Sequence, residues 1–541
     1  MPDRIESFKV VCSGGLNSNE NHLDLADSLP GAATRLINYE PSLFGGYRRI
    51  EGYQVLDPSF PEVGAGEAEG PVLTVAVFRD VFNPYIIAAR KDIGEDTYSF
   101  YRKVAGVDWD KIATGRAMTD GFNTVKKIRH VQFDFGTGNQ IAFADGINPP
   151  LVFDGTDFFT LNVSGDGTEQ NPGGDQIVVA PSVVDAFENH LFFSGDTVDL
   201  SVVCHSAPND PLNFTVAAGA GQILAGFPVV QIKPFRDNLF VFGTNSIKKI
   251  RPDFQAAFVI EQVTANVGCI ARDSVQEIAG DLIFLAPDGF RPVAGTSRIG
   301  DVEIETISKP IQSRIIELID RATEDTLNSV VVRKKSQVRF FFGDASVATV
   351  SSVGIVGGLT NNGGEIRWEF GDLRGFRASC ATSEFVGVDE FVLHGDFDGR
   401  VYRQEQGVSL AGEDIVAVYS TPYLDFGDTE VRKVLHRINT FVRAEGPFTL
   451  NLSLQYDWGD QDTARPSAYD QESLGAPTVF GGEGVTYGGI SVNYGGNNRP
   501  VMISDLQGSG YSVRATFVSV GQTKSHTIQG MVFEFALSGR R

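Results

Sequence analysis

A short pattern of alternating apolar and polar residues recurs along most of the chain. In the segment FRDNLFVFGTN, residues 235–245, a charged turn leads into a strand-like run that ends near a glycine. Runs such as LFFSGD, LIFLAPDG and VRFFFGD have the same character, and their Gly and Asp residues supply the positive φ that hairpin turns need. The first apolar residues of the six copies are Ile141, Leu191, Leu239, Leu282, Val338 and Phe391. The pattern predicts the same β-hairpin at six places.

The spacing of these copies indicates one particular architecture. Successive copies are 50, 48, 43, 56 and 53 residues apart, close to the roughly 40–50 residues of a β-propeller blade. Each copy follows another strand and usually precedes a third, as in PLVFDG and SIKKIRPD, and an earlier block over 72–112 reads as four more strands. A one-sided sandwich explains alternating strands but not this period. We therefore predict a six- or seven-bladed β-propeller over residues 71–411.

The two ends of the chain have different patterns. Residues 1–70 contain candidate strands on either side of Gly45 and Gly46, and we expect part of this segment to close or clamp the propeller ring. Over 412–541 the chain has six longer strands, which predict a C-terminal β-sandwich of jelly-roll-like type. Residues 459–499 are rich in glycine and poor in periodic apolar residues, so we expect an extended loop there.

One segment interrupts the β pattern. In SKPIQSRIIELIDRATED, residues 308–325, Ile311 and Ile315 fall on one helical face. Ser308 is the expected N-cap and Pro310 lies in the first turn, where proline is tolerated. The sequence predicts a helix between the fifth and sixth blades.

Composition supports a β-rich globular protein with an acidic surface. The 541 residues are 42% hydrophobic and 21% charged, with 60 Gly and 40 Phe, a mixture that favours strands and tight turns. The 68 acidic and 45 basic side chains give a net charge of −23. Such a charge opposes sequence-independent binding to nucleic acid phosphates, whereas it suits a surface past which DNA slides, or simply keeps a large protein soluble.

The cysteines and the apolar segments indicate where the protein folds. Its four cysteines, Cys12, Cys204, Cys269 and Cys380, are widely separated and form no C-x-x-C pair. This count favours a reducing compartment over a disulfide framework. The first residues lack the apolar run of a signal peptide, and no segment reaches 18 apolar residues. We expect synthesis and folding in a cytoplasm, without stable membrane insertion.

Motifs of known chemistry are missing from the sequence. It has no G-x-S-x-G elbow, P-loop or H-E-x-x-H motif, and its seven histidines have no ligand spacing. In HGDFDGR, residues 394–400, Asp396 and Asp398 could begin a calcium loop, but Gly407 stands where a ligating Glu is needed, so a hairpin turn is the simpler interpretation. The polar segment 165–175 is interpreted as an ordinary loop. We predict no catalytic, cofactor-binding or metal-binding residue and no cofactor.

Basic residues also give no clear binding signal. The sequence KKIR occurs at 126–129 and again at 248–251. Two or three basic residues on a strand do not make a nucleic-acid-binding stripe in a chain of this net charge.

Several segments along the chain, taken in order, match one family pattern. The N-terminal segment is GGLNSNENHLDLADSLPGAATRLINYEPSLFGGYRRIEGY, and the ring contains DLSVVCHSAPNDPLNF and VVQIKPFRDNLFVFGTNSIKKI. The C-terminal segments are STPYLDFGDTEVRKVLHRI and LQGSGYSVRATFVSVGQTKSHTIQGMVFEFALSGRR. In this order they resemble the β-propeller tail-hub or nozzle proteins of short-tailed bacteriophages, also described as packaged-DNA stabilisation or tubular tail proteins. The glycine-rich segment 459–499 has no place in the family pattern.

The resemblance implies a structural virion protein and not an enzyme. Copies of such a protein, typically six, form a ring below the portal and adaptor proteins. The ring extends and gates the DNA channel, retains packaged DNA and anchors tail fibres, a needle or other tail proteins. Assembly then takes place in the host bacterial cytoplasm, the mature location is the virion tail, and genomic DNA passes without sequence-specific binding. Acidic side chains facing the lumen would keep DNA from adhering.

Two other classes of protein share the predicted fold. A propeller carbohydrate-binding module or polysaccharide-degrading enzyme would place acids, arginines and aromatic residues together at one mouth of the propeller. A scaffold for protein partners would lack catalysis and would form no closed ring. The repeat does not separate these alternatives, because a fold does not fix a function.

Overall fold

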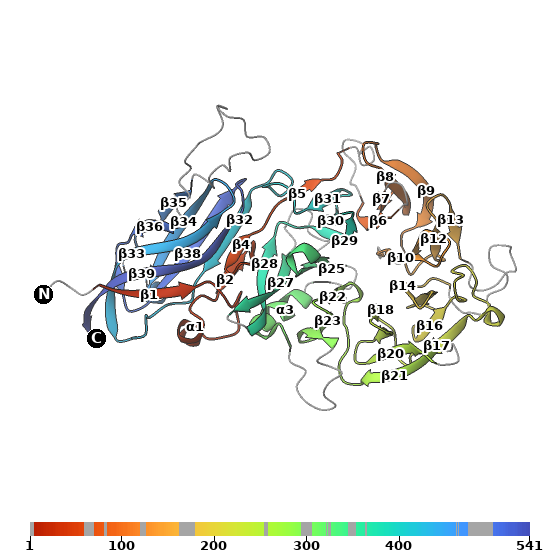
Figure 1. The fold of residues 1–541 in the computed structure, drawn as a ribbon, viewed down its shortest axis with the longest axis horizontal. Coiled ribbons are helices and arrows are strands. Elements are labelled where there is room, and N and C mark those ends of the chain that lie inside the picture. The colour runs from red at the N-terminus through yellow and green to blue at the C-terminus, as the bar shows by residue number, and fades with distance from the viewer. Residues whose placement is uncertain are drawn as a thin grey trace.

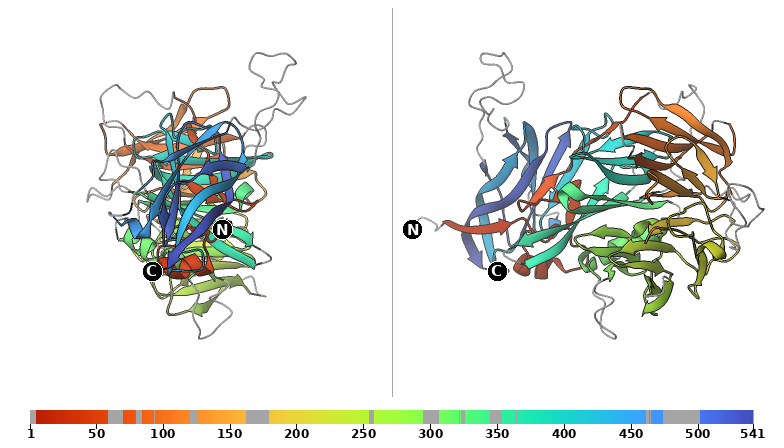
Figure 2. Two further views of the ribbon diagram at one scale, coloured as in Figure 1. Left: turned by 90° about the vertical axis from the view of Figure 1, so that its left-hand side faces the viewer. Right: turned by 45° about the vertical axis from the view of Figure 1, so that its right-hand side comes forward.

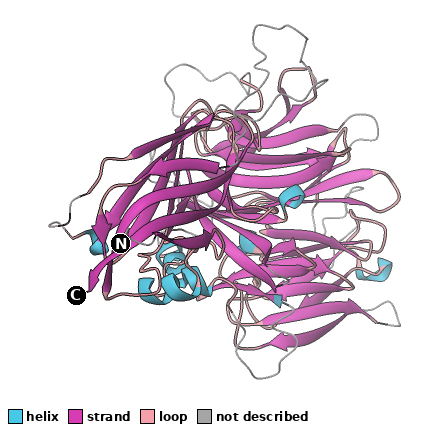
Figure 3. Cartoon of the chain, turned by 60° about the vertical axis from the view of Figure 1, so that its left-hand side comes forward, coloured by secondary structure: helices cyan, strands magenta, loops and turns pink. Residues whose placement is uncertain are grey.

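The computed structural model contains two adjoining β-rich parts (Figure 1). It describes residues 5–58, 70–79, 84–92, 94–119, 126–161, 179–253, 258–293, 306–320, 322, 326–343, 353–362, 365–460, 463, 465–473 and 501–540. One part is a ring of small sheets, and the other is a pair of larger sheets at the end of the molecule that carries both termini (Figure 1). One group of short helices lies where the two parts meet, and other helical turns are scattered over the molecule (Figure 3).

The ring is a β-propeller, as the period predicts. Four sheets of four antiparallel strands follow one another along the chain, and a three-stranded sheet comes next. The first two blades are β6 (Val72–Phe78), β7 (Tyr85–Lys91), β8 (Thr97–Lys103) and β9 (Asp110–Ala117), and β10 (Arg129–Asp134), β11 (Asn139–Ala144), β12 (Leu151–Phe153) and β13 (Phe158–Thr160). The third to fifth blades are β14 (Val183–Phe187), β15 (His190–Ser194), β16 (Val202–His205) and β17 (Gly221–Leu224); β18 (Gln231–Phe235), β19 (Asn238–Phe242), β20 (Ile247–Pro252) and β21 (Phe258–Thr264); and β22 (Gln276–Ile278), β23 (Asp281–Ala286) and β24 (Gly289–Pro292).

Two further groups of strands complete the ring. The first, called here the shared sector, consists of β25 (Leu327–Val332), β26 (Gln337–Phe342), β27 (Val353–Asn362) and β28 (Glu365–Arg374), and it begins a nine-stranded sheet that continues out of the propeller. The second, the closing blade, consists of β29 (Ala378–Val386), β30 (Asp389–Asp396), β31 (Val401–Gln404) and the N-terminal strand β5 (Tyr53–Val55). In the described part of the chain, the ring thus has six separate sheets and one sector that belongs to a larger sheet.

The recurring sequence pattern marks the same position in every unit. Its six copies fall on β11, β15, β19, β23, β26 and β30, and each of these is the second strand of its group. These strands are buried on both faces, as in Leu191, Phe192 and Phe193 of β15, because a neighbouring blade covers each side. The pattern recurs because every blade meets the same packing requirement.

Apolar clusters hold neighbouring blades together. One cluster joins Phe100 and Phe143 across the first two blades, and similar clusters lie between the other neighbours around the ring. Between the fifth blade and the shared sector, Phe290 stacks on Phe340 with ring centroids 4.0 Å apart. This contact belongs to the same core as Phe517 of the C-terminal sheets. The hydrophobic core is therefore continuous from the propeller into the second part of the molecule.

Two large sheets form the C-terminal part (Figure 2). The shared sector continues through β2 (Arg35–Ile37), β32 (Ile415–Ser420), β38 (Val513–Gly521), β34 (Phe448–Tyr456) and β35 (Tyr469–Ser473). A seven-stranded sheet contains β1 (Ile5–Val11), β3 (Tyr39–Pro41), β4 (Tyr47–Arg49), β33 (Val431–Ala444), β36 (Val501–Asp505), β37 (Ser509–Gly510) and β39 (His526–Arg540). Alternate side chains of β34 and β39, such as Leu452 and Phe533, are buried in one core shared by both sheets.

The N-terminal segment takes part in both halves of the molecule. Tyr53 of β5 pairs with Gln404 of β31, so this segment supplies the fourth strand of the closing blade. However, β1 pairs with β39 along its whole length, from Ile5 opposite Ala536 to Val11 opposite Gly530. Most of the N-terminal strands thus belong to the C-terminal sheets, in addition to the ring-closing contact that the sequence suggests.

Two expected boundaries differ from the structure. The predicted division at 411/412 falls within a continuous sheet, because β2 pairs with both β28 and β32. The prediction of a loop throughout 459–499 is wrong for β35, which pairs with β34 and contributes the buried side chain of Gln471. Residues 474–499 lie outside the described residues.

The predicted helix is shorter than expected. A 3-10 turn, η3 (Lys309–Ile311), leads into α3 (Gln312–Ile319), which buries Ile315 and Leu318. Ser308 occupies the N-cap position of η3, as predicted, but its side chain makes no capping hydrogen bond, and its hydroxyl accepts from the backbone N–H of Phe290 at 2.9 Å. A second short helix, α1 (His22–Ser28), begins after Asn21, whose side chain accepts from the backbone N–H of Leu23.

Candidate functional site

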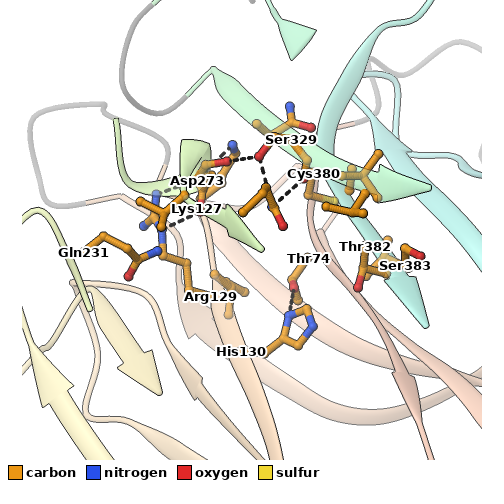
Figure 4. A pocket seen from close by; sticks show the side chains of 18 of the residues that line it. Thr74, Lys127, Arg129, His130, Gln231, Asp273, Ser329, Cys380, Thr382 and Ser383 are labelled. Atoms are coloured by element: carbon orange, nitrogen blue, oxygen red, sulfur yellow. Dashed lines mark hydrogen bonds and ion pairs between the residues drawn. The ribbon is translucent and has the colours of Figure 1, made fainter. Parts of the chain in front are cut away.

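The first strands of the blades surround a polar cavity of about 250 Å³ at the centre of the ring. Figure 4 shows side chains from several blades converging on this space. Each of β6, β10, β14, β18, β22, β25 and β29 contributes lining residues. Residues more than 300 positions apart, such as Thr74 and Thr382, therefore meet at one site.

A buried carboxylate organises one side of the cavity. Asp273 lies in the 3-10 turn η2 (Arg272–Ser274), and Arg129 donates to its two oxygens from Nε at 2.9 Å and Nη2 at 2.8 Å. Lys127 Nζ donates to Asp273 Oδ2 at 3.2 Å and to the carbonyl of Leu327 at 2.6 Å. The carboxylate of Asp273 thus forms ion pairs with both Lys127 and Arg129, which lie at the start of the second blade.

Burial and charge act in opposite directions on these groups. Burial alone would raise the pKa of Asp273, but Arg129 and Lys127 outweigh it and hold that pKa below its ordinary range. Burial lowers the pKa of Lys127, and Arg129 lowers it further, while Asp273 opposes both effects. Asp273 is therefore ionised at neutral pH. Its ion pairs with Lys127 and Arg129 connect the start of the fifth blade to the start of the second blade.

The rest of the lining also consists of partnered polar groups. Lys233 Nζ lies 3.2 Å from Asp185 Oδ2, and burial raises the pKa of Asp185 despite this lysine. His130 Nδ1 is 3.0 Å from the hydroxyl of Thr74. Burial and the nearby Lys233 lower the pKa of His130 to about 4, so its imidazole is neutral at pH 7.

The charge of the cavity is opposite in sign to that of the whole chain. Its described lining contains four basic and two acidic side chains, a net charge of +2 when all six are ionised, in a protein of net charge −23. The basic side chains are Lys127, Arg129, Lys233 and Arg333, and the acidic ones are Asp185 and Asp273.

The lining shows no activated nucleophile among the described residues. Ser383 donates to a carboxylate oxygen of Glu390 at 2.8 Å, and Ser329 donates to the backbone carbonyl of Asp273. Burial raises the pKa of Cys380 to about 11, so its sulfur is a thiol at neutral pH. Among the described residues that line the cavity there is no Phe, Tyr or Trp, the rings that sugar binding commonly uses.

The two KKIR segments have different environments. The copy at 126–129 supplies Lys127 and Arg129 to the cavity. In the copy at 248–251, Arg251 and Lys249 pair with Glu261 on the surface. The sequence analysis did not identify Lys127 and Arg129 as site residues. The two KKIR segments are identical, so the sequence does not show which of them faces the central cavity.

The candidate calcium segment forms a tight turn between β30 and β31. The backbone N–H of Asp398 donates to Asp396 Oδ1, and the side chain of Asp398 pairs with Arg377. Burial raises the pKa of Asp396 to about 6. Nowhere in the described ranges do three or more His, Cys, Asp or Glu side chains gather as metal ligands. The other candidate segment, 165–175, lies outside the described residues.

A second charged cluster joins the two halves of the molecule. Glu40 of β3 pairs with Arg339 of β26 at 3.2 Å, with Lys335 at 2.7 Å and with Arg48 at 3.0 Å. Arg339 and Lys335 also pair with Glu405, just after β31. The cluster therefore connects the C-terminal sheets, the shared sector and the closing blade.

Comparisons with known proteins show no family. No protein-family model matches the chain, and no curated protein sequence matches it. Among solved structures, Raptor from Chaetomium thermophilum has a TM-score of 0.33 at 9% identity, and the match covers 63% of this chain and 29% of that one. BBS1N, from its complex with ARL6DN, has a TM-score of 0.36 at 9% identity, with 67% of this chain and 99% of that one covered. Neither of these two proteins is a bacteriophage tail protein. Among the described residues, no helix has the length and apolar character needed to span a membrane.

Proposed function

We propose that this protein is a structural component of a bacteriophage short tail, in which copies form a ring below the portal and adaptor proteins. Six copies per ring follow from the family that the sequence resembles. The ring extends and gates the DNA channel, retains packaged DNA and anchors fibres or other tail proteins. In this proposal the two C-terminal sheets are a jelly-roll-like β-sandwich.

The observation that carries the proposal is the nine-stranded sheet shared by the propeller and the C-terminal part. Ile37 of β2 pairs with both Asp372 and Val418, so backbone hydrogen bonds run without interruption between the two parts. The core around Phe290, Phe340 and Phe517 is also continuous. Because one sheet and one core join them, the propeller and the C-terminal sheets resist bending relative to each other. The wall of a channel that retains packaged DNA needs such stiffness.

Two further observations are consistent with a structural role. The cavity at the hub lacks an activated nucleophile among its described residues, and its two carboxylates are each paired with a cation. The net charge of −23 disfavours adhesion to passing DNA. Replacing lumen-facing acids by neutral residues should slow DNA ejection, and unchanged ejection would contradict this part of the proposal.

The alternative, a carbohydrate-binding module or polysaccharide-degrading enzyme, predicts a different binding partner. The test mixes the purified protein with assembled portal–adaptor complex and, separately, with a panel of bacterial polysaccharides, and measures co-sedimentation. Binding to the portal–adaptor complex alone supports the tail proposal. Binding or cleavage of a polysaccharide without binding to the portal–adaptor complex would overturn it.

A further inference from the structure

The outer face of the seven-stranded sheet carries a group of exposed apolar side chains, called here the first patch. In the register of the sheet, Gly530 of β39 lies between Val11 of β1 and Phe441 of β33. Phe441 also lies opposite Val501 of β36, and Ile503 projects from the same face two residues further along that strand. Val11, Phe441 and Ile503 are all exposed. Exposed apolar residues grouped in this way mark a contact surface for another molecule.

Two unpaired cations flank the first patch. Lys9 follows Val11 and Arg443 follows Phe441 at a spacing of two residues, so both lie on the same face, and both are exposed. Within the described part of the chain, neither forms an ion pair with a carboxylate. Carboxylates around them already have partners: Asp505 pairs with Arg437, Glu445 pairs with Arg48, and Glu534 accepts from Asn439. The two cations are therefore available to carboxylates of another molecule.

The outer face of the nine-stranded sheet carries a second patch, which has an acidic rim. Val416 of β32 lies directly opposite Val520 of β38, and the two side chains are 45% and 54% exposed. Exposed carboxylates lie on both sides of these valines: Asp414 just before β32, and Asp470 and Glu472 on β35. Among the described residues, none of these three acids has a salt-bridge partner.

The two patches point in opposite directions, because the two sheets pack on one shared core. Each patch has an apolar centre, and the unpaired charges at their rims have opposite signs. Complementary charge of this kind guides association and disfavours other partners. Two different surfaces of one chain that fit each other make a head-to-tail contact, and such contacts close into a ring when the rotation between copies allows it.

We propose that these two patches bind each other between copies of this chain. The outer face of the seven-stranded sheet of one copy packs on the outer face of the nine-stranded sheet of the next copy. Phe441 and Val520 lie in the apolar centre of the contact, where burial of their side chains stabilises it. A ring of copies is part of the proposed function, and this assignment of its interface rests on that function.

Sedimentation velocity at a series of protein concentrations tests the interface. Wild-type protein should associate, and Phe441→Asp or Val520→Asp should each weaken association by about tenfold or more, because each places an unpaired carboxylate in an apolar contact. Lys9→Glu should also weaken it, because the substitution places like charges across the contact. The control Val388→Asp, at a residue of the closing blade that is 87% exposed, should associate as the wild type does. All four side chains are exposed, so the variants should fold, and thermal unfolding checks this.

An equimolar mixture of Phe441→Asp and Val520→Asp separates a head-to-tail contact from other kinds of association. Each variant keeps the patch that the other has lost, so the mixture should form a dimer with one copy of each and stop there. A mixture that stays monomeric at the highest concentration would overturn the proposal. Wild-type protein that stays monomeric both alone and with portal–adaptor complex would also overturn it.

Failure of the tail function would give a different result from failure of this interface. Open chains of copies, or rings that ignore the portal–adaptor complex, would support the interface and contradict the tail function. Rings that form on the portal–adaptor complex equally well from wild type, Phe441→Asp and Val520→Asp would support the tail function and overturn the interface.

Discussion

Arg339 in the propeller and Glu40 in the N-terminal segment form an ion pair of 3.2 Å although 299 residues separate them, and each side chain is only 1% exposed. The pair lies where the shared sector meets the N-terminal strands of the seven-stranded sheet. A buried ion pair rarely adds much net stability, but losing one partner leaves the other charge unsatisfied in a low-dielectric environment.

Replacing Glu40 by Gln should therefore destabilise the protein strongly. Arg339, Lys335 and Arg48 all lose a carboxylate partner, and the free energy of unfolding should fall by about 3 kcal/mol. Urea denaturation measures the change. Glu261→Gln, which breaks exposed surface pairs with Arg251 and Lys249, is the control and should leave the unfolding midpoint unchanged. An equal loss of unfolding free energy in Glu40→Gln and Glu261→Gln would show that the buried cluster around Glu40 does not stabilise the junction between the propeller and the C-terminal sheets.

His526 should make the protein less stable in mild acid. It is fully buried, contacts the hydroxyl of Tyr39 at 2.9 Å and stacks on Phe448 with ring centroids 4.1 Å apart. Burial, with a smaller effect of Arg49 and Arg48, lowers its pKa to about 3. The pKa of His526 in the folded protein lies below the ordinary value of about 6.5. Below pH 6.5 the unfolded chain therefore binds a proton that the folded protein does not, and the free energy of unfolding falls as the pH is lowered from 6.5 toward 3.

The variant His526→Gln should remove this part of the pH dependence. Between pH 6 and 4.5 the slope of unfolding free energy against pH should decrease by about 1.4 kcal/mol per pH unit. Denaturation at a series of pH values measures the slope. His436→Gln, at an exposed position, is the control and should keep the wild-type slope. A wild-type slope in His526→Gln would mean that His526 titrates alike in the folded and unfolded chain.

The closing of the ring should depend on Gly52. This residue precedes β5, and a Cβ there would overlap the carbonyl oxygen of Ser409, an atom that accepts from the backbone N–H of Tyr53. Gly52→Ala must displace backbone and should cost about 1–3 kcal/mol of stability. At Gly358 a Cβ would come no nearer to another residue than 3.3 Å, to the Cγ of Gln337, so Gly358→Ala should cost much less. Thermal unfolding of both variants compares them, and a reversed order would argue against closure by β5.

The four cysteines should be unreactive in the folded protein. All four are buried and none is in a disulfide. Burial raises the pKa of Cys12 to about 12 and that of Cys380 to about 11, which leaves little reactive thiolate at neutral pH. A chromogenic thiol reagent should detect no rapidly reacting thiol in native protein and four after denaturation. A fast native reaction would show that the interfaces between blades open readily.

The propeller could be predicted from the sequence because its period is a local property. Each copy of the hairpin carries its own turn and its own apolar strand, as in Leu239 to Phe242. The path of the nine-stranded sheet could not be predicted in this way. It depends on the pairing of Ile37 with Asp372, residues far apart in the sequence that no local pattern connects.

The candidate site was less predictable than the fold. Lys127 and Arg129 belong to one of two identical tetrapeptides, and only the arrangement of blades distinguishes the buried copy from the surface copy. Asp273 gives no signal in the sequence, because its role depends on cations 144 and 146 residues away. The lining residues come together only when the blades close into a ring, so the sequence of a single blade does not reveal the central cavity.

The central claim is that copies of this protein form a closed ring that surrounds a DNA channel. Light scattering at several protein concentrations, alone and with portal–adaptor complex, followed by negative-stain imaging of the same samples, tests it most directly. The account predicts a closed ring, either in the protein alone or on addition of the portal–adaptor complex, with an opening wide enough for duplex DNA. A monomer at every concentration that ignores the portal–adaptor complex would contradict it.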